Sequence, residues 1–165
     1  ATALIQPLDP EADLDRVTVF YADAPDYWLM AEGIAPGREK AAAFFTDTPP
    51  GCDPAVSNRL GLFLDGRLSG LAELSYGFPE PDDAYLGLMI LGPWARDAGH
   101  GRAFLAHAER LARQSGARQI YLGVLDINIR GRAFWEREGF VPTGIARTET
   151  DGLRHTIHRL RKPLT

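Results

Sequence analysis

A glycine-rich loop between an apolar run and a helical pattern constrains the fold of this chain most. Residues 84–91 form an apolar run that predicts a strand, and residues 99–114 carry apolar side chains at helical spacing. The sequence RDAGHG, residues 96–101, stands between them. A second apolar run, residues 118–125, follows and is typical of a buried central strand. The segment therefore predicts a right-handed strand–helix–strand crossover with two parallel strands.

The remaining segments predict further strands and helices around this unit. Asp65-Gly66 lies between two apolar runs, which is a strong hairpin signal. The other expected elements are a strand at 2–8, a helix at 9–24, a loop or broken helix at 25–37, a short helix at 37–48, a hairpin at 59–76, a helix at 128–139 and a hairpin at 140–162 that turns at Asp151-Gly152. Together they predict one α/β domain over residues 1–165, of the mixed α+β kind. Its core is a single mixed, mostly antiparallel sheet of about seven strands with flanking helices.

The composition argues against several classes of function. A net charge of −4 at pH 7 argues against nonspecific binding of nucleic acid, which needs clustered Lys and Arg. No apolar run approaches the ~20 residues that cross a bilayer, and the first residues do not resemble a secretory signal, so we expect a cytoplasmic protein. Cys52 is the only cysteine, and His155 and His158 would face opposite sides of a strand. Neither a disulfide nor a metal site is therefore indicated.

The RDAGHG loop has the chemistry of an anion-binding site. A helix N-terminus presents unpaired N–H groups and a partial positive charge, and glycine there lets a phosphate approach the backbone. The Gly-Lys-Ser/Thr of nucleotide triphosphate loops is missing, and Phe104 replaces the third glycine of the dinucleotide pattern. Two interpretations stay open: the loop binds a pyrophosphate, or its glycines only permit a tight turn before an ordinary helix.

Two motifs resemble the signatures of the GNAT superfamily of N-acetyltransferases. LGPWARDAGHGRAFL, residues 91–105, is similar to the acyl-CoA signature with its Arg-x-x-Gly-x-Gly core. NIRGRAFWEREGF, residues 128–140, is similar to the second signature, an Asn followed by an aromatic pair and Gly-Phe. The resemblance implies a GNAT-like sheet whose central strands splay apart. It also implies acetyl-CoA as the co-substrate.

The resemblance implies roles for individual residues. Those implied for binding CoA are Met89, Ile90, Leu91, Arg96, Asp97, Ala98, Gly99, His100, Gly101, Arg102, Asn128 and Trp135. The N–H of Leu91 would face the thioester carbonyl and stabilise its developing negative charge. Asn128 is a cofactor ligand, a helix N-cap or both. Trp135 stands where the family often has a tyrosine acting as general acid; an indole cannot deliver a proton at neutral pH, and its alternative role is packing in the core.

The acceptor side leaves weaker signals in the sequence. Glu73 is a charge inside an otherwise apolar strand beside the thioester strand, so it either deprotonates the attacking amine or lies on a solvated face. Tyr27, Trp28 and Glu80 are candidate substrate contacts.

The leading hypothesis is an N-acetyltransferase that moves acetyl from acetyl-CoA directly to a primary amine of a small molecule or peptide. The alternative is a CoA-binding regulatory module with little or no catalysis. By analogy, exposed edge strands in the C-terminal hairpin would allow a homodimer.

Overall fold

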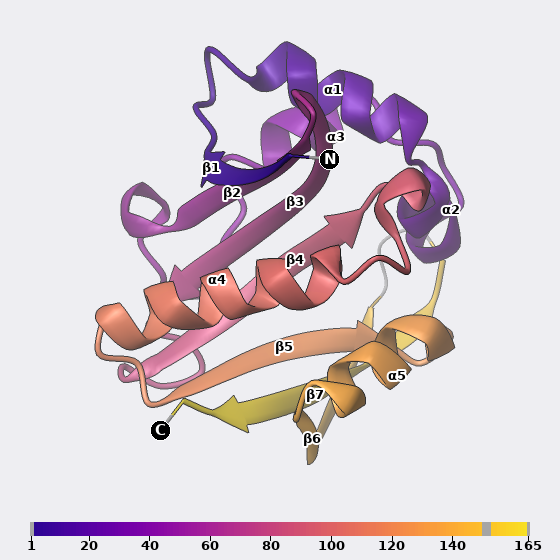
Figure 1. Cartoon of the computed structure of the whole chain (residues 1–165). Helices are drawn as coiled ribbons and strands as arrows, with labels where there is room; N and C mark the ends of the chain where they lie inside the picture. Colours follow the sequence, from indigo (N-terminus) through magenta and orange to yellow (C-terminus); the bar gives the residue numbers. More distant parts are fainter. Residues whose placement is uncertain (1, 150–152, 165) are drawn as a thin grey trace.

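A single sheet with helices on both faces forms the framework of the molecule (Figure 1). The computed structural model describes residues 2–149 and 153–164. Within them the sheet has seven strands in the order β1-β2-β3-β4-β5-β7-β6. The strands are β1 (Ala3–Pro7), β2 (Asn58–Leu64), β3 (Arg67–Tyr76), β4 (Asp83–Leu91), β5 (Gln119–Leu125), β6 (Val141–Glu149) and β7 (His155–Pro163). The β4–β5 pair is parallel and the other described pairs are antiparallel, which confirms the predicted mixed sheet.

Two groups of helices cover opposite faces of this sheet. The first group is α1 (Leu14–Asp23), α2 (Asp26–Glu32) and α3 (Arg38–Ala43), and the second is α4 (His100–Gln114) and α5 (Ile129–Arg137). Two 3₁₀ turns complete the elements, η1 (Pro54–Val56) and η2 (Pro93–Ala95). Leu71 and Ala72 are neighbours on β3 but belong to different core clusters, the first with α1 and α3 and the second with α4 and α5. None of the described helices is long and apolar enough to span a membrane.

The N-terminal helices are shorter than the sequence predicts. The helix expected from residue 9 begins at Leu14, because the Asp9 side chain accepts hydrogen bonds from the N–H groups of Glu11 (2.9 Å) and Ala12 (2.7 Å). This local side-chain turn competes with the first helical turn. The segment expected as a loop or broken helix contains α2, and the helix expected to reach residue 48 ends at Ala43.

The first predicted hairpin is confirmed. Asp65 (φ 48°) and Gly66 (φ 82°) both adopt left-handed conformations, as a two-residue turn between β2 and β3 requires. The expected parallel pairing of β4 with β5 across α4 is also confirmed. The expected turn at Asp151-Gly152 lies outside the described residues, although the strands that flank it, β6 and β7, pair as an antiparallel hairpin.

Candidate active site

Strands β4 and β5 separate after a short stretch of pairing. Residues 83–85 of β4 pair with residues 119–121 of β5, and no described residue of β5 pairs with residues 86–91. The splay implied by the family resemblance is therefore present. One side of β4 is left with main-chain groups that an extended ligand can pair with.

The main-chain direction at the end of β4 decides which amides face this gap. The N–H of Gly92, directly after β4, donates to the carbonyl of Ser69 in β3 at 2.8 Å. Because successive N–H groups of a strand point to alternate sides, those of Leu91 and Met89 point away from β3 and into the gap. The N–H of Ile90 points toward β3, and its side chain is buried against α1 and α3. Of the three β4 residues that the resemblance implies for binding CoA, Met89 and Leu91 therefore offer an N–H to the gap and Ile90 does not.

The loop that follows η2 exposes a run of unpaired main-chain donors. No described residue accepts a hydrogen bond from the N–H groups of residues 97–102, six of the residues predicted to bind CoA. Asp97 (φ 63°) and Gly99 (φ 83°) are left-handed, and α4 begins directly after them. Such an alternation turns successive N–H groups to one side and forms an anion-binding hollow. The N-terminus of a 15-residue helix adds its dipole, so the loop fits a pyrophosphate.

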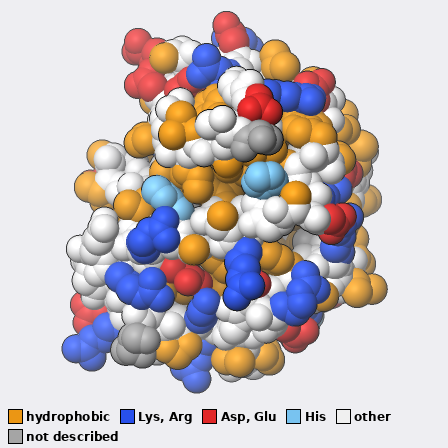
Figure 2. Space-filling view, in the orientation of Figure 1, with side chains coloured by type: hydrophobic (Ala, Val, Ile, Leu, Met, Phe, Trp, Pro, Cys, Tyr) orange, Lys and Arg blue, Asp and Glu red, His pale blue; other side chains and the backbone are white. Residues whose placement is uncertain are grey.

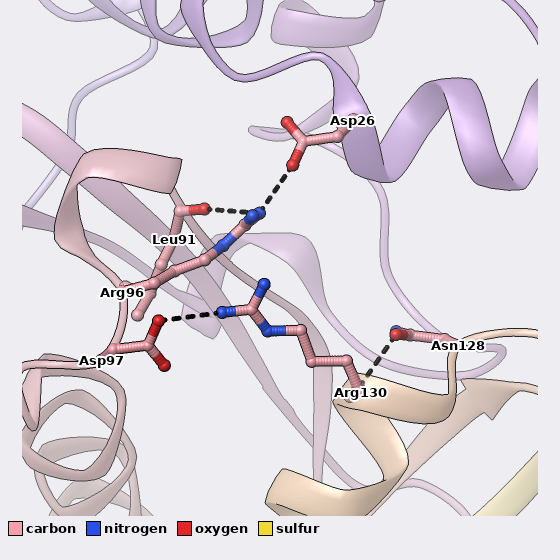
Figure 3. A network of polar contacts seen from close by, with 7 residues as sticks. Asp26, Leu91, Arg96, Asp97, Asn128 and Arg130 are labelled. Atoms are coloured by element: carbon pink, nitrogen blue, oxygen red, sulfur yellow. Dashed lines mark hydrogen bonds and ion pairs between the residues drawn. The ribbon is translucent and has the colours of Figure 1, made fainter.

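Side chains hold this loop from both directions (Figure 3). Arg96 Nη2 donates to Asp26 Oδ2 of α2 at 2.9 Å and to the Leu91 carbonyl at 3.3 Å. On the other side, Arg130 Nη2 of α5 donates to Asp97 Oδ2 at 3.3 Å. The Arg96 side chain therefore positions the loop against α2 in addition to any contact with a ligand. Arg130 was not among the predicted site residues, although it lies inside the second motif.

Helices α4 and α5 and the end of β4 pack closely together beside the loop. A Cβ built on Gly101 would lie 3.3 Å from the Phe134 ring and 3.4 Å from Leu91, so a larger side chain here would push α4 away. Trp135 is only 9% exposed and packs edge-on against Phe134 and Phe140. The structure thus places Trp135 in the core, the alternative considered from the sequence. Phe134 is the aromatic residue that borders the loop.

Basic side chains gather on the face that α4 and α5 cover, in the lower half of the view (Figure 2). Each of these helices carries three arginines, against one glutamate each. Arg102, next to the loop, leaves 81% of its side chain exposed and lies 3.6 Å from Glu138. This local excess of positive charge attracts a ligand that bears several phosphates, although the whole chain is acidic.

Asn128 begins α5 as its N-cap. Its Oδ1 accepts a hydrogen bond from the Gly131 N–H at 2.9 Å (Figure 3). The capping interpretation is confirmed, and the two amide hydrogens of the side chain stay available for a ligand. The two roles predicted for Asn128 are therefore compatible.

The two roles of Asn128 can be separated by substitution. We expect Asn128→Ala to lower the free energy of unfolding by about 1 kcal/mol, because the cap is lost. Asn128→Asp keeps the capping oxygen and should keep the stability, but it removes the amide donor. If that donor binds CoA, isothermal titration should show weaker acetyl-CoA binding by both variants, while thermal unfolding separates them. Equal stability of both variants and the parent would contradict the capping role.

A cavity of about 400 Å³ lies on the opposite face, between the sheet and α1–α3. It reaches β4 at Gly87 and Leu88, beside the gap. Its other lining residues are the aromatic Tyr21, Trp28, Phe44, Phe78 and Tyr85, the basic Lys40, Arg59, Arg147 and Arg159, the acidic Asp47 and Glu73, and Ala43, Thr48, Pro49 and Pro50. The predicted contact Trp28 thus lines the cavity. The other two predicted contacts, Tyr27 and Glu80, do not line the cavity. The Tyr27 ring packs against the Trp28 ring with centroids 5.1 Å apart, and Glu80 is exposed in the loop before β4.

Glu73 lies buried in the wall of this cavity and not on a solvated face. It is 5% exposed. Ser75 Oγ donates to its Oε1 at 2.5 Å, and Arg59 Nη1 lies 3.5 Å from the same oxygen. The other oxygen lies so close to Gly87 that a Cβ there would overlap it. Burial raises the pKa of the Glu73 carboxyl, although the Ser75 hydrogen bond and the Arg59 charge act against this. A buried carboxyl with a raised pKa, in a cavity, is suited to accept a proton from an amine.

Comparison with known proteins identifies the class to which this fold and this loop belong. The chain matches the family model described as the acetyltransferase (GNAT) family over residues 19–140, more than half of its length, and it belongs to this family. The members are acetyltransferases that use acetyl-CoA. In sequence, no curated protein matches the chain.

Solved structures agree with this assignment at the level of the fold. An acetyltransferase from Thermus thermophilus is 23% identical with a TM-score of 0.74, and the match covers 99% of this chain and 97% of that chain. The ribosomal-protein-S18-alanine N-acetyltransferase from Escherichia coli is 20% identical (TM-score 0.71; 99% and 95% covered). PaiA N-acetyltransferase from Thermoplasma acidophilum, solved in complex with coenzyme A, is 22% identical (TM-score 0.69; 99% of each chain covered).

Proposed function

We propose that this protein transfers the acetyl group of acetyl-CoA directly to a primary amine of a small molecule or peptide, within a ternary complex. One observation carries the proposal. The unpaired N–H groups of residues 97–102 and of β4 lead from the protein surface to the cavity in which Glu73 lies. A donor and an acceptor that enter from opposite faces would meet at the gap, so proximity supplies much of the rate.

The donor side uses main-chain groups. In the bound state acetyl-CoA supplies an activated acyl group as its thioester. The N–H groups of residues 97–102 would hold its pyrophosphate, and those of Leu91 and Met89 its pantetheine arm. Glu73 pairs with Leu88 in the sheet, and Leu91 lies three residues beyond, about 10 Å at ~3.3 Å per residue. The amine that Glu73 deprotonates must reach the thioester carbonyl. The Met89 N–H is therefore better placed than the Leu91 N–H to stabilise the negative charge that develops on the carbonyl oxygen, and we assign this role to Met89 in place of Leu91.

The acceptor side uses two titratable side chains. Glu73 takes a proton from the acceptor ammonium, directly or through one water, and so frees the nitrogen lone pair for a C–N bond to the acyl carbon while the C–S bond breaks. Tyr85 points its hydroxyl across the gap, 3.1 Å from a Cβ built on Gly123 of β5. Burial raises the pKa of Tyr85, so the hydroxyl stays protonated at neutral pH and can donate to the departing sulfur. It would replace the tyrosine that the family often has at the position of Trp135.

Thermal unfolding with and without acetyl-CoA tests the donor assignment. A ligand that binds only the folded protein adds about 2.7 kcal/mol at 100 times its Kd, so we expect Tm to rise by several degrees. ATP and NAD serve as controls and should leave Tm unchanged at equal concentration. No rise at millimolar acetyl-CoA would contradict the proposal. A rise without release of CoA thiol over a broad panel of amines would instead favour the regulatory module.

A further inference from the structure

We infer that the acceptor is a small amine that also carries an anionic group, as an amino acid does, and that Arg159 binds this group. The inference rests on the proposed acetyl transfer and names its acceptor class. The chain as a whole has a net charge of −4, yet basic residues outnumber acidic ones in the lining of the cavity. The charged lining residues are Lys40, Arg59, Arg147 and Arg159 against Asp47 and Glu73. The cavity is therefore a local reversal of the overall charge.

Two of these basic residues are already matched by carboxylates. Arg59 Nη1 lies 3.5 Å from Glu73 Oε1, and both side chains are only 7% exposed. Lys40 Nζ donates to Glu32 Oε2 of α2 at 2.8 Å. Arg159 is different, because it makes no ion pair with the described side chains of residues 2–148 and 153–164. Its guanidinium instead lies over the Phe78 ring, 5.0 Å from the centroid, and this contact holds it at the cavity wall without neutralising its charge.

Arg159 lies close to the place where the acetyl group would be transferred. Arg159 of β7 pairs with Gly123 of β5, and a Cβ built on Gly123 would lie 3.1 Å from the Tyr85 hydroxyl. The Phe78 ring under the guanidinium packs edge-on against Tyr85 with centroids 5.2 Å apart. Burial is the main reason that the pKa of Tyr85 is raised; the charges of Arg147 and Arg159 act against this, and the charge of Glu73 adds to it. The lining of the cavity thus holds a carboxylate, Glu73, and a guanidinium, Arg159, together with Tyr85, the residue proposed to serve the departing sulfur.

This pair of charges selects a zwitterion and gives it an orientation. An ammonium group favours Glu73 and a carboxylate, sulfonate or phosphonate favours Arg159, whose planar donors bind such groups in pairs. The amine nitrogen then receives the acetyl group, and its proton passes through Glu73. A polyamine would instead bring a second positive charge against Arg159, which disfavours it. At about 400 Å³ the cavity is near the lower limit of small-molecule sites, which suits an acceptor of amino-acid size.

Turnover of matched pairs of amines tests this inference. The probes are the standard L-amino acids against their α-amides, 2-aminoethylphosphonate against ethanolamine, and spermidine, with release of CoA thiol as the readout. We expect at least one probe with an anionic group to exceed its matched partner without that group by about 10-fold or more in kcat/KM, because a hydrogen bond to a charged group is worth about 1.5–3 kcal/mol, or 10- to 150-fold. The amino acid and phosphonate arms distinguish which anionic group is bound.

Substitution of Arg159 ties the preference to this side chain. Arg159→Gln should raise KM for the preferred acid at least about 10-fold and leave KM for acetyl-CoA unchanged. Arg159→Lys, which keeps the charge, should restore part of the preference. Arg161→Gln is the matched control, since Arg161 is exposed on the same strand and does not line the cavity; it should change neither KM.

Each other outcome has a definite meaning. Equal turnover of acids and amides, or a preference for spermidine or peptides, would overturn the anionic-acceptor inference and leave the acetyl transfer standing. Unchanged selectivity in Arg159→Gln would also overturn it. Turnover of none of the probes would overturn the inference, and together with no rise of Tm by acetyl-CoA it would overturn the proposed function as well.

Discussion

Replacement of Glu73 by glutamine should lower kcat by about 10²- to 10⁴-fold, the usual contribution of a positioned acid or base. The amide keeps the shape of the carboxyl group but cannot take a proton from the acceptor. The Kd for acetyl-CoA should stay near the parent value, because Glu73 is not among the groups proposed to bind acetyl-CoA. Steady-state kinetics with an accepted amine measures the first quantity and isothermal titration the second. Glu80→Gln, at an exposed carboxylate outside the cavity, should retain full activity.

The pH dependence gives the same assignment a second test. In its proposed role as the base, Glu73 must be ionised, and burial raises the pKa of its carboxyl. Activity should therefore fall as pH is lowered through a pKa above the ordinary glutamate value of about 4.3. The Glu73→Gln variant should lose this acidic limb of the kcat/KM profile. An unchanged limb in the variant would assign the base to another group.

The geometry of the loop at residues 96–101 could be predicted from the sequence because it is local. Gly99, Gly101 and the helix they precede are contiguous, so their spacing alone indicates a helix N-terminus with free N–H groups. Even there, tertiary packing changed two roles. Arg96 extends to Asp26 of α2, 70 residues earlier in the chain, and Trp135 turns into the core while Phe134 borders the loop. No pattern within one helix indicates which of two adjacent aromatic residues faces inward.

The acceptor cavity could be predicted only in part because it is assembled from segments far apart in the chain. Glu73 stood out as a single charge in an apolar strand, and Trp28 as an aromatic residue in the first third. Arg59, Arg147 and Arg159 come from three different strands, and their convergence depends on the order of the sheet. In the sequence, Arg159 belongs to a basic stretch, residues 154–162, whose mixture of charged and apolar residues favours a strand with one solvated face. Closeness in the sequence is also a poor guide: Glu80 lies only seven residues after Glu73 but does not line the cavity.

Replacement of Arg59 by leucine should lower the free energy of unfolding by about 3–5 kcal/mol, the usual effect of removing one partner of a buried ion pair. Arg59 Nη1 also donates to the carbonyls of Phe44 and Asp47, each at 2.7 Å, and so ties β2 to the end of α3. Without the guanidinium, Glu73 would be a buried carboxylate with no opposite charge beside it. Denaturant unfolding at neutral pH, with circular dichroism to confirm the fold, measures the loss. Arg38→Leu is the control, because its pair with Asp15 is 62% and 83% exposed and should contribute about 0–1 kcal/mol.

If the stability lost in Arg59→Leu comes from the unpaired charge of Glu73, the loss should depend on pH and on a second substitution at Glu73. Burial already holds the pKa of Glu73 above its ordinary value, and removal of Arg59 raises this pKa further. A carboxyl with a raised pKa in the folded state stabilises the fold below its unfolded pKa, and this stabilisation is lost as pH rises through the folded pKa. The deficit of Arg59→Leu should therefore be larger at neutral pH than near pH 4. Adding Glu73→Gln to Arg59→Leu removes the uncompensated charge and should recover part of the lost stability. If the two losses simply add, the ion pair is not their cause, and the carbonyl contacts of Arg59 account for its effect.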